Sequence, residues 1–92
     1  MIKSFIHKGL KKYYLTGNPS GINPNHKKKI TIQLSALDTA TTIDDLDLPG
    51  FDLHYLSGNR KNILSIGVNK NWRITFEFKN GDVYILNYED YH

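Results

Sequence analysis

The sequence contains no cysteine, three prolines and one tryptophan among its 92 residues. The missing cysteine excludes disulfide bonds and thiolate metal sites, and it fits the reducing cytosol. No apolar run approaches the ~18 residues that a membrane-spanning helix needs, and residues 1–5 lack the apolar centre of a secretion signal. We therefore expect a cytoplasmic protein with no membrane partner.

Acidic residues are absent from the first 37 positions, which hold seven lysines. Positions 38–52 hold five aspartates and neither lysine nor arginine, and the whole chain has a net charge of +3. A basic block attracts phosphate groups or an acidic protein surface. The same lysines can also simply form a solvated helix face, so the composition leaves both interpretations open.

The length predicts a single domain over residues 1–92. A domain of this size buries only about 60% of the surface that its unfolded chain exposes. It therefore has one modest core and no room for a large internal cofactor site, and we expect no cofactor.

Residues 1–16 and 23–39 are predicted to be helices, because their apolar residues recur at intervals of three and four. Asn23 and Pro24 suit the N-cap and first position of the second helix. A further helical turn is expected after Thr42. The apolar positions are Leu10, Tyr13 and Tyr14 in the first helix, and Ile30, Leu34 and Leu37 in the second.

The C-terminal part is predicted to be strands, because apolar and polar residues alternate. The expected strands cover residues 52–56, 64–69, 72–79 and 83–88, and Asn80-Gly81 is a strong hairpin signal. Helices followed by strands indicate an α+β fold, with helices packed on one face of an antiparallel sheet. The face with Trp72 and Phe76 should meet the helices, and the face with Arg73 should meet solvent or a ligand.

Candidate functional residues are scattered, because the sequence has no Gly-rich phosphate loop, zinc-ligand spacing or nucleophile elbow. Arg73, two residues beyond Asn71, can hold a phosphate or form a cross-strand ion pair with Glu77 or another acid. His54 and His92 can each transfer a proton near neutral pH. The chain ends in Asp90-Tyr91-His92 directly after a well-patterned strand, so we expect these residues to have a defined position.

Several segments together resemble one family. They are Met1–Phe5, Leu37–Thr41, Leu53–Arg60, Ser65–Phe76 and Glu89–His92. The most specific features are Asn71-Trp72-Arg73-Ile74 and the terminal Asp-Tyr-His. The chain resembles the HigB-type toxins of the RelE superfamily of toxin–antitoxin systems over nearly its whole length. The resemblance implies a RelE-like fold, with two to three N-terminal helices packed on one face of a small, twisted antiparallel sheet.

The resemblance also implies an activity, which is cleavage of mRNA in the ribosomal A site and arrest of translation. The nucleophile would be the RNA 2′-hydroxyl, with no metal. A HigA-type helix-turn-helix antitoxin would bind the toxin, and only their complex would bind operator DNA.

The family roles transfer to matching positions. Arg73 would stabilise charge on the scissile phosphate, Asn71 would orient the RNA, and His92 would transfer a proton, with His54 as a second candidate. Asp90 would orient His92, and Tyr91 would brace the substrate. Residues expected to bind RNA are Arg60, Lys61 and Lys70, and those expected to dock on ribosomal RNA are Lys27, Lys28 and Lys29.

Two departures from the family pattern reduce the positive charge of the expected cleft. Relatives often carry lysine at the position of Ser57, and a basic residue where Gly67 and Asn69 stand. Two other functions remain possible at this point. One is a non-catalytic growth inhibitor on the same fold, like the ParE-type inhibitors of DNA gyrase. The other is a protein-interaction module.

Overall fold

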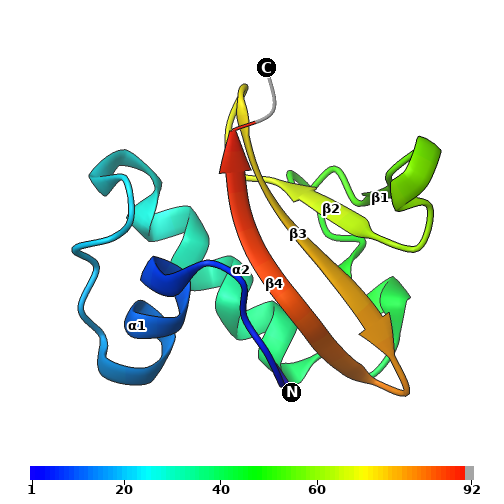
Figure 1. Cartoon of the computed structure of the whole chain (residues 1–92), viewed down its shortest axis with the longest axis horizontal. Helices are drawn as coiled ribbons and strands as arrows, with labels where there is room; N and C mark the ends of the chain where they lie inside the picture. The colour runs from blue at the N-terminus through cyan, green and yellow to red at the C-terminus, as the bar shows by residue number, and fades with distance from the viewer. Residues whose placement is uncertain (91–92) are drawn as a thin grey trace.

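The computed structural model describes residues 1–90 and has two layers, helices on one side and an antiparallel sheet on the other (Figure 1). Within these residues the sheet has four strands in the order β1-β2-β3-β4, so every strand pairs with its neighbour in the chain. The predicted α+β class is confirmed. In the same part of the chain, no helix combines the length and apolar character needed to span a bilayer.

The helical layer begins later than the sequence suggested. Helix α1 covers Lys8–Thr16, so the prediction of helix from residue 1 was wrong. Residues 1–6 instead run alongside β4, where Ile2 and Phe5 form parallel bridges to Val83 and Leu86 (Figure 1). The backbone N–H of Lys3 donates to the Val83 carbonyl at 2.7 Å. Pairing with a distant strand thus satisfies backbone groups along the edge of β4.

The second predicted helix is split into two parts. A short 3₁₀ turn, η1, covers Pro24–His26, and α2 covers Lys27–Thr39. Asn23 accepts a hydrogen bond from the backbone N–H of Asn25, which confirms the predicted cap. The turn expected after Thr42 is η2, Ile43–Leu46, closed by a capping box between Thr42 and Asp45.

The sheet consists of β1 (His54–Tyr55), β2 (Leu64–Gly67), β3 (Trp72–Lys79) and β4 (Asp82–Asp90). The first strand is shorter than predicted, since Asp52 adopts a positive φ of 50°. A 3₁₀ turn, η3, covers Gly58–Arg60 between β1 and β2. The hairpin prediction is confirmed, because Asn80 and Gly81 both have positive φ (52° and 83°) and directly connect the paired ends of β3 and β4.

The β3–β4 ladder contains an irregularity that changes the register. Near the hairpin Glu77 pairs with Tyr84, whereas beyond the shift Thr75 pairs with Asn87 and Arg73 with Glu89. Ile85, inside the irregularity, has a φ of 51° and is exposed. One extra residue in β4 reverses which of its side chains face the helices. Val83 is buried before the shift, and Leu86 and Tyr88 are buried after it.

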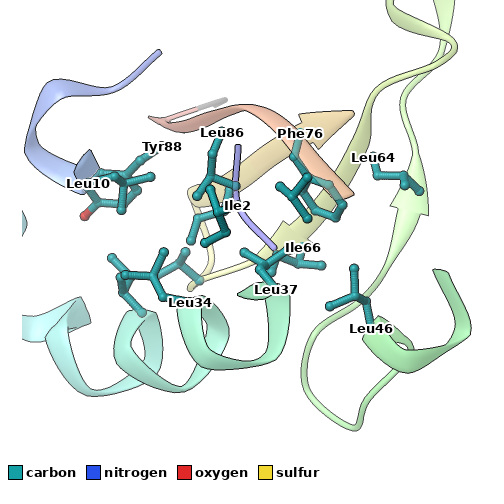
Figure 2. Close-up of a cluster of buried hydrophobic side chains, with 14 of the residues drawn as sticks. Ile2, Leu10, Leu34, Leu37, Leu46, Leu64, Ile66, Phe76, Leu86 and Tyr88 are labelled. Atoms are coloured by element: carbon teal, nitrogen blue, oxygen red, sulfur yellow. The ribbon is translucent and has the colours of Figure 1, made fainter. Parts of the chain in front are cut away.

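The core lies between the sheet and the helices (Figure 2). Leu34 and Leu37 of α2 face Ile66 and Phe76 of the sheet, and Leu46 closes the far end (Figure 2). All the apolar positions predicted for α2 are buried, and Leu10 is buried in α1. Tyr13 and Tyr14 are partly buried and pack against the core, as predicted. The opposite face of the sheet is therefore left for polar side chains.

Candidate functional site

The sheet face turned away from the helices carries two rows of polar or small residues. In one row the strand pairing places His54, Ser65, Thr75 and Asn87 side by side across the sheet. In the adjacent row Gly67, Arg73 and Glu89 are paired in the same way. Four strands thus bring His54 and Arg73 to one surface, although 19 positions separate them in the chain.

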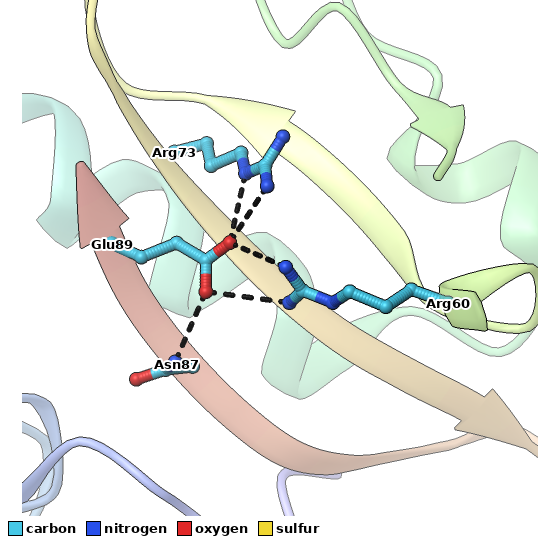
Figure 3. A network of polar contacts seen from close by, with 4 residues as sticks. All are labelled: Arg60, Arg73, Asn87 and Glu89. Atoms are coloured by element: carbon cyan, nitrogen blue, oxygen red, sulfur yellow. Dashed lines mark hydrogen bonds and ion pairs between the residues drawn. The ribbon is translucent and has the colours of Figure 1, made fainter. Parts of the chain in front are cut away.

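Glu89 is the centre of the hydrogen-bond network on this face (Figure 3). Its Oε1 accepts from Nε and NH2 of Arg73 at 3.0 and 2.8 Å. Arg60 reaches the same carboxylate from η3, with NH1 and NH2 at 3.0 and 3.3 Å from the two oxygens. Asn87 donates to Oε2 at 3.2 Å. One carboxylate therefore holds two guanidinium groups together at the end of β4.

The cross-strand ion pair that sequence reasoning allowed for Arg73 is present, with Glu89 as the partner. Arg73 is the second residue of β3, which begins at Trp72, and Asn71 lies in the preceding turn. Its side chain is only 16% exposed and that of Arg60 is 44% exposed. Arg73 is thus held firmly on the sheet, whereas Arg60 is the more accessible of the two.

Glu89 remains charged because of its partners. Burial raises the pKa of this carboxyl, but the hydrogen bonds and charges of Arg60 and Arg73 together outweigh burial and lower it. The three side chains of this cluster are two guanidinium groups and one carboxylate. Such a cluster can bind a phosphate group, since guanidinium presents planar donors that match its oxygens.

The remaining predicted catalytic residues lie on β1, in the β2–β3 turn, at the end of β4, or outside the described part. His54 is exposed on β1, and its Nδ1 lies 2.8 Å from the carbonyl oxygen of Asp52. Asn71 is exposed in the β2–β3 turn. Asp90 is exposed and pairs with Trp72 at the end of β4, so its side chain lies on the helical side of the sheet and not on the polar face. Tyr91 and His92 lie outside the described residues, so their predicted roles stay predictions.

The other predicted RNA contacts occupy two separate surfaces. Lys61 follows η3 directly after Arg60, and Lys70 lies in the turn beside Asn71, so both border the polar face. The lysines expected to meet ribosomal RNA lie on the helical layer, at the beginning of α2. They line shallow hollows on α2, and Nζ of Lys29 donates to the Gly50 carbonyl at 3.0 Å. The lysine run Lys27–Lys29 therefore belongs to the opposite layer from Arg73.

The departures from the family pattern have different structural settings. A Cβ atom added at Gly67 would meet only ordinary contacts, 3.8 Å from the Phe51 carbonyl oxygen and 3.9 Å from Cβ of Asp52. Asn69 instead has hydrogen bonds of its own, to His26 and to the turn that follows. Ser57 is exposed just before η3. Space for an added basic residue thus exists at Gly67, next to Arg73 in the ladder.

Two residues of this region were missed by sequence reasoning. Glu89 could have been found only by counting the hairpin register with the extra residue of β4 included. His26 precedes α2 and carried no signal of its own, yet it is buried and bonded to the β2–β3 turn. Within residues 1–90, no three His, Cys, Asp or Glu side chains gather closely enough to hold a metal ion.

Comparison with known proteins identifies the family. Residues 3–92 match the family described as RelE-like toxin of type II toxin-antitoxin system HigB. A protein from Proteus vulgaris named Endoribonuclease HigB is 53% identical over 92 residues, which cover the whole of both chains.

Solved structures show the same fold at low sequence identity. YafQ from Escherichia coli BL21(DE3) aligns with a TM-score of 0.56 and 12% identity, over 98% of this chain and 91% of its own. The Helicobacter pylori protein HP0894 aligns with a TM-score of 0.50 and 15% identity, over 97% and 96%. The family match, the full-length relative and the shared fold agree, and the chain belongs to the HigB-like family of RelE-like toxins of type II toxin–antitoxin systems.

Proposed function

We propose that this toxin is an endoribonuclease that cleaves mRNA in the A site of the ribosome and so stops translation. The observation that carries the proposal is the cluster of Arg60 and Arg73 around Glu89, on a sheet face that also presents His54. The name of the full-length Proteus vulgaris relative, Endoribonuclease HigB, supports the same activity.

The proposed reaction uses the RNA itself as the nucleophile. The 2′-oxygen attacks the adjacent phosphorus, the bond to the 5′-oxygen breaks, and a 2′,3′-cyclic phosphate forms. Arg73 stabilises the charge that develops on the phosphate oxygens, because its guanidinium group is already oriented by Glu89. Arg60, Lys61 and Lys70 attract the neighbouring phosphates of the message.

Two proton transfers balance this reaction. One group removes the proton of the 2′-hydroxyl, and another donates a proton to the leaving 5′-oxygen. We assign these transfers to His54 and His92, with Asp90 orienting His92. Asn71 orients the RNA from the exposed β2–β3 turn, and Tyr91 braces the substrate. No step of this reaction requires a cofactor or a metal ion.

The partners proposed for this toxin follow from its place in a toxin–antitoxin system. We propose that a HigA-type helix-turn-helix antitoxin binds it, and that only the complex contacts operator DNA. On the ribosome, the exposed Lys27 and Lys28 together with Lys29 would contact ribosomal RNA from the helical layer, while the polar sheet face meets the message. We propose that the toxin acts in the cytoplasm, where the ribosomes are.

Primer extension on a translated message tests the proposed activity. With purified toxin, new 5′ ends are expected when ribosomes are present and not when they are omitted. Arg73→Ala and a chain lacking His92 should each reduce cleavage by about 10²-fold or more, the usual loss when a positioned donor or acid is removed. Lys79→Ala removes a positive charge from the far end of the same strand and should cut normally.

Two results would contradict the proposal. If no new 5′ ends form on ribosomes at toxin concentrations that arrest growth, the chain is not a ribosome-dependent nuclease. If growth arrest survives the loss of His92 and is accompanied by DNA damage, inhibition of gyrase without catalysis replaces it.

A further inference from the structure

His26 is a buried polar residue that the proposed reaction does not use. It is only 4% exposed and lies beneath the β2–β3 turn, at the junction of η1 and α2. Its Nδ1 lies 2.5 Å from the hydroxyl oxygen of Tyr88, and its Nε2 lies 2.6 Å from Nδ2 of Asn69. The ring also packs edge-on against Trp72 at a centroid distance of 5.7 Å.

The hydrogen bonds of Asn69 determine which ring nitrogen of His26 carries the proton. Oδ1 of Asn69 accepts from the backbone N–H groups of Asn71 and Trp72, both at 3.1 Å. The amide nitrogen of Asn69 therefore points at His26 and must donate to it. Nε2 of His26 is consequently the acceptor, so the ring is neutral and its Nδ1–H donates to Tyr88.

The surroundings of His26 agree with a neutral ring. Burial lowers the pKa of the imidazole. Among the described residues, Tyr88 of β4 is the titratable group in contact with the ring, and His7, which precedes α1, packs against Tyr88 in turn. Burial raises the pKa of Tyr88, which keeps the phenol protonated. The chain Tyr88–His26–Asn69 is thus a neutral network that ends on the backbone of the turn.

A second buried side chain holds the other side of the same turn. Gln33 of α2 is completely buried, and its Nε2 donates to the Gly67 carbonyl at 2.7 Å. The turn between Gly67 and Trp72 is therefore attached to the helical layer at two points, through Gln33 at Gly67 and through His26 at Asn69. An apolar side chain would fill the space of His26 without burying polar atoms. His26, bonded through both nitrogens, instead fixes the side chain of Asn69, which in turn holds the backbone of the β2–β3 turn.

We propose that His26 is a positioning residue for RNA cleavage, which acts through Asn69 on the turn that carries Asn71 and leads into Arg73. This inference rests on the proposed function and deepens it, because it assigns to the helical layer control over the geometry of the polar face. A turn released from His26 would let Asn71 shift and would loosen the start of β3, while the rest of the fold stays in place.

His26→Phe tests this role, because it preserves the aromatic packing and removes both hydrogen bonds. Val83→Ala is the matched control, since it removes buried volume at the opposite, hairpin end of the sheet. Both variants are assayed below their melting temperatures. His26→Phe should lower kcat for cleavage on ribosomes by about tenfold or more with little change in KM, the scale of loss that small misplacements cause.

The turn itself supplies a readout that does not depend on activity. In His26→Phe, hydrogen exchange of the Asn71 and Trp72 amides should be at least about tenfold faster, while Val83→Ala leaves these two amides unchanged. Asn69→Asp keeps the two acceptor bonds to the turn but presents an oxygen to Nε2 of His26. It should therefore place a proton on Nε2 of His26, visible in the NMR shifts of the ring nitrogens.

These measurements separate the two claims. If the wild-type chain cuts no RNA, the proposed function fails, and the amide exchange still decides whether His26 holds the turn. If amide exchange in His26→Phe is unchanged, or if kcat falls no more than in Val83→Ala, the positioning role is wrong. It is also wrong if His26 of the wild-type chain carries its proton on Nε2.

Discussion

The two faces of the sheet are built from the same strands by different means. The apolar face packs Ile66, Ile74 and Phe76 against α2, and each of these side chains is buried among many interchangeable neighbours. The polar face depends on a few directed bonds, with Glu89 holding Arg73 from the adjacent strand and Arg60 from a distant turn. Packing tolerates small adjustments, whereas a guanidinium pair requires a particular register.

This contrast indicates that the apolar face mainly provides stability and the polar face mainly provides activity. Burial of the apolar face accounts for most of the folding free energy, because every buried methylene contributes. Ion pairs on a partly exposed surface contribute little to stability, since solvent screens them and side-chain entropy opposes them. Changes on the apolar face should therefore reduce stability, and changes on the polar face should reduce activity.

The largest expected effect is on the apolar face. Leu37→Ala should lower the free energy of unfolding by about 3 kcal/mol, because it opens a cavity in a side-chain cluster where Leu37 is completely buried. Urea denaturation measures the change. Leu15→Ala on α1, where the side chain is 63% exposed, is the control and should change stability by less than about 0.5 kcal/mol. Equal losses of unfolding free energy in the two variants would contradict the view that the apolar face provides most of the stability.

On the polar face, Arg73→Lys should reduce cleavage by about a hundredfold while lowering the free energy of unfolding by less than about 1 kcal/mol. An ammonium group cannot reproduce the paired Nε and NH2 donors that Glu89 accepts. Single-turnover cleavage on programmed ribosomes and urea denaturation measure the two quantities. Lys79→Arg, at the other end of the strand, should alter neither. If Arg73→Lys lowers the free energy of unfolding strongly but cleaves normally, the proposed difference between the two faces is wrong.

As the pH falls, the free energy of unfolding should decrease in two steps, first through histidines and then through carboxyl groups. The folded-state pKa values of His26 and His7 are lowered by burial, so their contribution to stability is complete above the ordinary pKa of 6.5 and is lost as the pH falls below it. The pKa of Asp38 is lowered, first by the hydrogen bond from Tyr14, and that of Glu89 by its arginines. Their contribution should disappear only below the ordinary carboxyl range.

Urea denaturation at a series of pH values measures both steps. His7→Asn is the control for the first step, since asparagine can cap α1 as His7 does but does not titrate. It should reduce the loss of stability just below pH 6.5. A stability that stays constant from pH 7 to pH 5 would show that neither histidine is held neutral by the fold.

The smallest expected effect is a gain. Gly67→Lys should increase the affinity for RNA several-fold at low salt, because it adds a positive charge next to Arg73 at a position where an added Cβ meets only ordinary contacts. Fluorescence anisotropy with an RNA lacking the reactive 2′-hydroxyl measures it, and the salt dependence should steepen by about one unit in slope. Gly67→Ser adds a side chain without charge and should leave the slope unchanged. If the salt dependence of RNA affinity has the same slope in both variants, the RNA does not bind next to Gly67.

The local pattern of the sequence was sufficient for the elements whose bonds are close in the chain. The spacing of Leu34 and Leu37 predicted the buried face of α2, and Asn80-Gly81 predicted the hairpin, since both depend on neighbouring residues alone. The same reasoning failed for residues 1–7, where a mixed pattern was interpreted as helix. The partner of that segment is β4, about eighty positions away, and local spacing contains no information about it.

By itself, the sequence determined the α+β class, the apolar face of the sheet, and the presence of Arg73 on the opposite face. Only the tertiary structure decided which groups Arg73 meets. The extra residue of β4 at Ile85 brings Glu89 opposite Arg73, where an unbroken two-residue hairpin would place Tyr88. The folding of η1 beneath the sheet likewise brings His26 to Asn69. Periodicity assigns a face, but a register and a contact between distant segments depend on the packing of the whole chain.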